Sequence, residues 1–184
     1  MSKLYKKLGE SAWTKVDKIN SEIFTLTYGE VVNSLIQDYE TSEEVNAQLD
    51  EMGYSIGIRM IDEFLAISEV EQCKSFRDTG EILAKVACKM YLGVDAVCKY
   101  WTEDDSAFTL ELKTNPFVDF VELPQKYKDL WYCNIICGII RGSLDTLQIS
   151  VDVKYQKCVL RGHNTNEIRV TLKSSNKENS SKKN

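Results

Sequence analysis

The sequence has 184 residues, of which 43% are hydrophobic and 28% charged, with six cysteines and a formal net charge of -5 at pH 7. This length and composition fit one domain with its own apolar core, and the negative charge argues against nucleic acid as the main partner. The chain contains no run of about 18 apolar residues and no apolar signal segment near its start, so we predict a cytosolic protein with free thiols.

The first helix is predicted over residues 22–39, and a second is predicted to begin at Thr41. In both segments apolar side chains recur at three- and four-residue spacing, which places them on one face of a helix. Thr41 and Glu44 have the spacing of a capping box, in which the two side chains accept hydrogen bonds from unpaired backbone N–H groups. Gly53 and Gly57 lie one turn apart, so we expect another backbone to approach the second helix closely there.

A third helix is predicted after Asp78 and Glu81, which repeat the capping spacing, and is expected to stop at Gly93. Beyond it, apolar residues alternate with polar ones, which indicates strands.

Four segments are predicted after the third helix. They are a hairpin over residues 94–112, a further extended segment over residues 117–123, a fourth helix over residues 125–148, and a second hairpin over residues 149–172. This order of elements, ααα-ββ-α-ββ, predicts an α+β fold with helices packed on one face of a twisted antiparallel sheet. We divide the chain into a flexible or helical N-terminal extension (1–17), a single domain (18–172) and a disordered basic tail (173–184).

Motifs for enzymatic chemistry are missing, because the sequence contains no phosphate-binding loop, zinc-hydrolase motif or nucleophile elbow. We therefore predict no catalytic residues, no metal site and no enzyme. His163, the single histidine, lies in a polar turn, so a surface position is favoured over a catalytic pair with Cys73. Cys133 and Cys137 lie one helical turn apart, but without a second pair they are predicted to be core residues and not metal ligands.

Cys73 is the one cysteine with polar neighbours, in the connector before the third helix. The helix that follows carries small residues, Ala84 and Ala87, next to Leu83 and Val86, which leaves room inside a core. Composition alone favours an ordinary surface cysteine over a modified one, whereas this room favours the alternative, a thiol that carries a lipid chain.

Four segments of the sequence resemble the signature segments of the trafficking protein particle (TRAPP) complex subunit three family. They are Glu22–Gly29 (EIFTLTYG), Met52–Arg59 (MGYSIGIR), Asn115–Pro124 (NPFVDFVELP) and Cys137–Leu144 (CGIIRGSL), and the resemblance extends from about Lys18 to Leu172. It implies the TRAPP small-subunit (bet-type) fold, which agrees with the order of elements above.

The resemblance also implies a function. Members of this family are core scaffold subunits of a complex that tethers vesicles between the endoplasmic reticulum and the Golgi and supports guanine-nucleotide exchange on a Rab-type GTPase. The implied partners are sister TRAPP subunits, the GTPase reached through the complex, and the vesicle coat, with a homodimer when the subunit is alone. The implied location is cytoplasmic and peripheral, at cis-Golgi and endoplasmic reticulum membranes.

No dissociable cofactor is implied, but a covalently bound palmitate is. The modified cysteine of the family matches Cys73, within Phe64–Cys73 (FLAISEVEQC), and the small residue of the tunnel wall matches Ala87. We add Leu83, Val86 and Ala84 to the expected tunnel lining. Two departures from the family are Gln72, where relatives often have Arg, and the basic tail in place of an acidic one. A thiol-dependent self-acylating or acyl-transfer protein using Cys73 is the alternative function.

Overall fold

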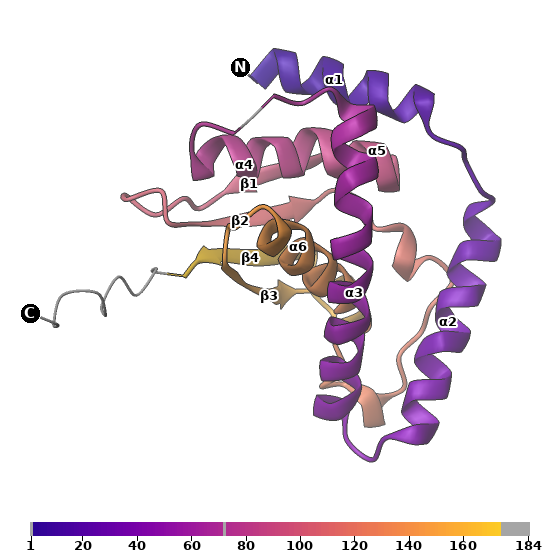
Figure 1. The fold of residues 1–184 in the computed structure, drawn as a ribbon. Coiled ribbons are helices and arrows are strands. Elements are labelled where there is room, and N and C mark those ends of the chain that lie inside the picture. Colours follow the sequence, from indigo (N-terminus) through magenta and orange to yellow (C-terminus); the bar gives the residue numbers. More distant parts are fainter. Residues whose placement is uncertain (1, 72, 174–184) are drawn as a thin grey trace, which may run out of the picture.

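Helices cover one face of a four-stranded antiparallel sheet in the computed structural model, which describes residues 2–71 and 73–173 (Figure 1). The helices are α1 (Ser2–Lys15), α2 (Ser21–Asp38), α3 (Ser42–Ser68), α4 (Phe76–Ile82), α5 (Cys88–Leu92) and α6 (Ile135–Thr146). The strands are β1 (Ala96–Lys99), β2 (Ala107–Leu112), β3 (Val151–Lys157) and β4 (Asn166–Leu172). A π-helical segment, η1 (Leu83–Ala87), joins α4 to α5. The predicted α+β class is therefore confirmed.

The two predicted hairpins form a single sheet of order β1-β2-β4-β3, in which every neighbouring pair is antiparallel. Side chains alternate between its two faces. The apolar ones, such as Phe108, Leu110 and Val170, are fully buried beneath the helices. The opposite face carries cross-strand ion pairs such as that between Lys99 and Glu111, whose Nζ and Oε2 atoms are 2.6 Å apart.

The capping box predicted for the second helix is present at the start of α3. The Glu44 amide donates to Thr41 Oγ1 over 3.2 Å, and the Thr41 amide donates to the Glu44 carboxylate over 3.1 Å. The third predicted helix starts earlier than expected, because Ser75 and not Asp78 is its N-cap: the Asp78 amide donates to Ser75 Oγ. Its stop at Gly93 is confirmed, with φ of +68°.

The close backbone approach predicted at Gly53 and Gly57 is confirmed, and the approaching helix is α6. A Cβ atom built on Gly53 would lie 2.1 Å from the Ile135 carbonyl oxygen. Gly138 and Gly142 of α6 make the reciprocal approach to the backbone of α3, where a Cβ on Gly138 would lie 2.0 Å from the Asp50 carbonyl oxygen. No larger side chain fits between these two helices at the four glycines.

The extended segment predicted over residues 117–123 is wrong. Asn115 caps a single 3-10 turn, Pro116–Val118, by accepting a hydrogen bond from the Phe117 amide, and the chain then continues without forming a strand. Phe117 of this segment packs on α2 instead of entering the sheet. Phe117 lies edge-on to Phe24 and Tyr28 of α2, with ring centroids 4.9 and 4.8 Å apart.

The fourth helix was predicted to start at Gln125, but α6 starts at Ile135. A 3-10 turn, Gln125–Tyr127, and turns occupy the intervening residues. Asn46 of α3 explains this: its side chain accepts from the Trp131 amide over 2.8 Å and donates to the Asp129 carbonyl over 3.3 Å. These bonds satisfy backbone groups that a helix would otherwise pair internally.

The N-terminal segment, for which both a flexible and a helical state were considered, is the helix α1. It lies across the outer side of α4, η1 and α5 (Figure 1), with Ala12 fully buried. The basic tail predicted over residues 173–184 lies, apart from Lys173, outside the described residues, and so does Gln72.

Candidate functional site

An apolar cavity of about 570 Å³ lies between α3, the α4–η1–α5 layer and α6. Its wall includes Cys73 and two other residues predicted from the sequence, Leu83 and Ala87. The volume is within the range of small-molecule pockets, roughly 300–1,000 Å³. The other residues of the wall are Met60, Ile61, Phe64, Leu65, Val70, Glu71, Thr79, Ile82, Tyr91, Ile139, Ile140, Ser143, Leu144, Leu147 and Ile149.

Two of the predicted lining residues, Ala84 and Val86, are not in this wall. Both are fully buried, but they belong to other contacts of the same helical segment. Ala84 packs in the core against the sheet, and Val86 packs in a second cluster beneath α1. Consecutive residues of a helix point in different directions, so only Leu83 and Ala87, four residues apart, share the side that faces the cavity.

Three hydroxyl groups in the wall are bonded to nearby backbone carbonyl groups. Ser143 Oγ donates to the Gly57 carbonyl over 3.1 Å, and Thr79 Oγ1 donates to the Ser75 carbonyl over 3.2 Å. The Tyr91 hydroxyl donates to the Met60 carbonyl over 3.1 Å, and burial raises the pKa of Tyr91. The wall is therefore mostly hydrocarbon surface, and its hydroxyl groups have their hydrogen bonds satisfied, which suits an alkyl chain.

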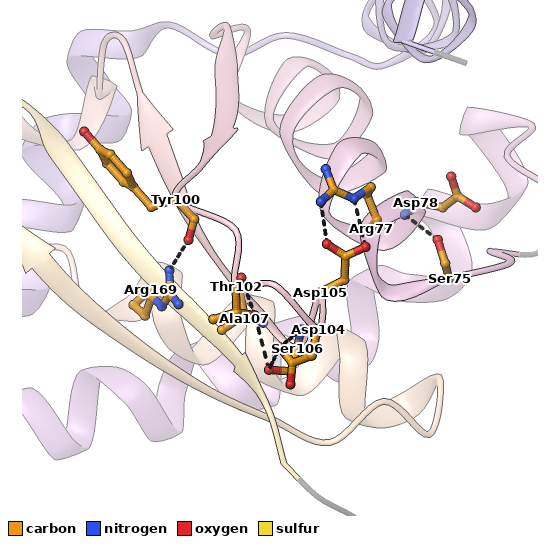
Figure 2. Close-up of polar contacts among 10 residues, drawn as sticks. All are labelled: Ser75, Arg77, Asp78, Tyr100, Thr102, Asp104, Asp105, Ser106, Ala107 and Arg169. Carbon is orange, nitrogen blue, oxygen red and sulfur yellow. Dashed lines mark hydrogen bonds and ion pairs between the residues drawn. The ribbon is translucent and has the colours of Figure 1, made fainter.

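Cys73 is a half-buried free thiol two residues before the N-cap of α4. The first turn of α4 is tied to the β1–β2 turn, because Arg77 donates to both carboxylate oxygens of Asp105 (Figure 2). Arg77 also lies over the Trp101 ring, 4.6 Å from its centroid. The Asp105 interaction raises the pKa of Arg77 and lowers that of Asp105, so both groups remain charged. This anchor fixes the first turn of α4, which begins three residues after Cys73.

The alternative chemical sites do not assemble around Cys73. His163 lies with its Nδ1 atom 3.1 Å from the Cys158 carbonyl, and it is not among the residues of the cavity wall. Cys133 and Cys137 are buried core residues, as predicted, and burial raises the pKa of both thiols. Across residues 2–71 and 73–173, no group of three or more His, Cys, Asp or Glu residues is arranged to hold a metal ion.

Most of the cavity wall was not anticipated from the sequence. Ile61 and Phe64 of α3, and Ile140 and Leu144 of α6, belong to apolar stripes that predict burial without saying against what. On α3 the sequence does carry a signal for the position of the cavity wall. The lining residues begin at Met60, shortly after the glycines at which α3 and α6 approach each other.

A second feature is the exposed apolar face at α2. Ile19, Ile23 and Leu26 are 74%, 66% and 69% exposed, whereas Tyr28 and Val32 of the same helix are buried. Phe120 is also exposed, and its φ of +63° is unusual for an aromatic residue. Such a concentration of exposed apolar side chains is typical of an interaction surface. Among the described helices, none combines the length and hydropathy that a membrane span requires.

Comparison with known proteins agrees with these features. Residues 24–171 match the family model described as "Transport protein particle (TRAPP) component". The chain is 51% identical to the trafficking protein particle complex subunit 3 of Dictyostelium discoideum, over 94% of this chain and 93% of that protein. It is 44% identical to the corresponding subunit, BET3, of Saccharomyces cerevisiae, over 93% of this chain and 90% of that protein.

Two solved structures are similar to the structure of this chain. The structure of a trafficking protein particle complex subunit 3 from Naegleria fowleri, covalently bound to palmitic acid, has a TM-score of 0.82 and 45% identity, covering 85% of this chain and 97% of that one. The phenol-responsive sensory domain of the transcription activator PoxR, at 12% identity and a TM-score of 0.54, covers 85% of this chain and 76% of that one. This second likeness concerns the fold alone.

Proposed function

The chain belongs to the transport protein particle (TRAPP) component family, and on that premise we propose that it is a scaffold subunit of a vesicle-tethering complex that carries an acyl chain on Cys73. The observation that carries the acyl assignment is the 570 Å³ apolar cavity with Cys73 in its wall. Support comes from the Naegleria fowleri protein, whose structure has palmitic acid covalently bound. The role of the acyl chain is structural, not catalytic.

The chemistry is a thioester exchange. The Cys73 sulfur attacks the carbonyl carbon of an acyl thioester donor, the new carbon–sulfur bond forms, the donor bond breaks, and the proton of the Cys73 thiol passes to the departing thiol. The alkyl chain then enters the cavity, where each buried CH₂ contributes about 0.8 kcal/mol. An unfilled cavity of this size would instead lack the contacts of a packed core.

Intact-mass spectrometry of the purified protein tests this assignment. We expect a stoichiometric adduct with the mass of one palmitoyl group, removed by hydroxylamine and missing from Cys73→Ser. A protein that stays unmodified when expressed in a eukaryotic host would contradict it. Repeated turnover of an acyl thioester by the wild type, and not by Cys73→Ser, would favour the alternative of a thiol-dependent acyl-transfer enzyme.

Assembly is the second part of the proposal. The exposed face formed by Ile19, Ile23 and Leu26 at α2 is the docking surface, for a second copy when the subunit is alone and for sister subunits in the complex. Through the assembled complex the chain supports nucleotide exchange on a Rab-type GTPase and engages the vesicle coat, at the cytoplasmic side of cis-Golgi and endoplasmic reticulum membranes. Exchange measured with reconstituted complex, with and without this subunit, tests that role.

A further inference from the structure

Helix α1 covers the outer side of the cavity wall without lining the cavity. Figure 1 shows it lying across α4 and α5, with its N-terminal end near the connector that carries Cys73. Its closest approach is at Gly9, where a Cβ atom would lie only 2.0 Å from the carbonyl oxygen of Lys85. Lys85 lies in η1 between Leu83 and Ala87, the two η1 residues that face the cavity. A movement of α1 therefore changes the packing of η1, which forms part of the cavity wall.

The inner side of α1 shares one apolar cluster with the wall. Tyr5, Leu8, Ala12 and Val16 pack in the cluster that also holds Cys73, along with Phe64 and Ile82 of the wall. Burial and the nearby Asp78 carboxylate raise the pKa of Tyr5. Tyr5 therefore lies close to the first turn of α4, within the cluster that also holds Cys73.

The polar attachments of α1 are few and accessible. Lys15 Nζ lies 2.5 Å from Glu69 Oε1, and both side chains are largely exposed. At the other end, Lys85 Nζ donates to Ser2 Oγ over 2.7 Å. A helix of 14 residues is marginal in water without tertiary contacts, so α1 keeps its structure mainly through this docking. Such elements open at lower free energy than the core.

We propose that α1 is a strap over the acyl cavity, which lifts to admit an acyl thioester to Cys73 and docks again once the chain is enclosed. This inference rests on the proposed acylation of Cys73. The proposal gives the N-terminal helix a regulatory role. An acyl chain in the cavity supports η1 from inside, so α1 docks on η1 more stably. The docked α1 then slows both loading and removal of the acyl chain. The docked state of α1 then depends on whether the cavity is occupied.

The variant Gly9→Ala tests the strap, because alanine improves helix propensity yet places a Cβ atom against the Lys85 carbonyl. The full-length, hydroxylamine-treated protein is mixed with palmitoyl-CoA, and the acylated fraction is followed by intact mass. We expect Cys73 of Gly9→Ala to be acylated about tenfold faster than in the wild type. The acylation rate rises in proportion to the fraction of molecules in which α1 is undocked, and we expect that fraction to rise by a comparable factor. Removal of the acyl group by hydroxylamine should accelerate similarly. Ser11→Ala, at an exposed position of α1, is the matched control and should load at the wild-type rate.

The outcomes separate the two proposals. If the wild type takes up no acyl group, acylation of Cys73 is wrong. If the wild type is acylated and Gly9→Ala is loaded and unloaded at the same rate or more slowly, the strap is wrong while the acyl site stands. Should Gly9→Ala fail to fold, Lys15→Glu takes its place by repelling Glu69 at the exposed end of α1, and a rate increase of about twofold is expected. Unchanged rates in that variant would overturn the strap.

Discussion

Cys73, the residue proposed to carry the acyl chain, lies in the wall of the apolar cavity. It lies at the end of a connector held by the cap of α4 and by the Arg77–Asp105 pair, and its side chain shares a wall with Ala87. The cavity therefore offers room for the alkyl chain that we propose Cys73 carries. The small size of Ala87 is part of that room, since a larger residue at this position extends from η1 into the cavity.

Replacement of Ala87 by Leu should block acyl enclosure. We expect the acylated fraction after palmitoyl-CoA treatment to fall about tenfold, because enclosing the chain against the added side chain costs at least 1.4 kcal/mol. The unacylated variant should keep wild-type stability within about 1 kcal/mol, since the empty cavity accommodates the side chain. Ala66→Leu, at an exposed position of α3, is the control. Normal acylation of Ala87→Leu would show that the chain lies elsewhere.

The β1–β2 turn next to α4 should show a defined pH dependence. Asp104 accepts hydrogen bonds from the Ser106 hydroxyl and amide, over 2.7 and 3.1 Å, which lowers its pKa to about 2 (Figure 2). Because the pKa is depressed on folding, the stabilisation is present above the unfolded value of about 3.9 and is lost as pH falls towards about 2. The stability difference between the wild type and Asp104→Ala, measured by urea denaturation, should shrink over this interval. A difference that grows on acidification would contradict the assignment.

At the level of elements, the molecule depends on one close helix pair. α3 and α6 approach at four glycines, and the interface is completed by the ion pair of Arg141 with Asp50 and by stacking of Arg141 on Tyr54, 4.4 Å from the ring centroid. This contact fixes the separation of the two helices that form one side of the cavity. The glycines are therefore needed for shape, despite their unfavourable helix propensity.

Gly138→Ala should destabilise the fold. Its Cβ atom would overlap the Asp50 carbonyl, and we expect a loss of about 2 kcal/mol in the free energy of unfolding, although alanine favours the helix. Gly29→Ala in α2 is the matched control. Its Cβ atom would lie 3.4 Å from the Tyr132 hydroxyl, so this change should be neutral or stabilising by up to about 1 kcal/mol. Denaturant titration measures both, and equal stability of the two variants would contradict the account of the α3–α6 contact.

The same elements show what the sequence could predict. Both hairpins, α2, the Thr41 capping box and the approach at Gly53 followed from local periodicity and spacing. Segments controlled by distant residues did not. The stretch before α6 is diverted by Asn46, about 85 positions away, and Phe117 packs into α2 instead of pairing in the sheet.

From the sequence we predicted the part of the cavity wall that η1 forms, but not the rest of the wall. Leu83 and Ala87 were identified, whereas Ala84 and Val86 were misplaced because the rotation of the helix about its axis was unknown. The π-helical turn of η1 also leaves no clear signal in composition. The resemblance to the TRAPP family pointed to Cys73 as the cysteine to be modified, whereas residue patterns alone marked it only as unusual.

At the scale of the whole molecule, the described residues leave two prominent apolar surfaces, the cavity and the exposed α2 face. We propose that an acyl chain fills the first and another subunit covers the second. The polar outer face of the sheet, with its ion pairs, needs no such cover. We therefore propose that other components, an acyl chain and a partner subunit, cover the two apolar surfaces of this chain.

The isolated protein should form a dimer through α2. We expect the double variant Ile23→Gln, Leu26→Gln to dissociate at least about tenfold more readily, since it removes two largely exposed apolar side chains from the proposed surface. Leu172→Gln, an exposed apolar residue of β4, is the control and should stay dimeric. Size-exclusion chromatography with light scattering at micromolar concentration measures the result. A monomeric wild type would contradict the surface assignment.

The most direct measurement for the central claim is the thermal stability of one preparation before and after removal of its acyl group with hydroxylamine. An enclosed chain is part of the core, so the acylated protein should melt about 5 °C or more above the deacylated form, and the Cys73→Ser variant should match the deacylated form. Equal melting temperatures for acylated and deacylated protein would mean that the chain lies outside the fold, and would contradict the account.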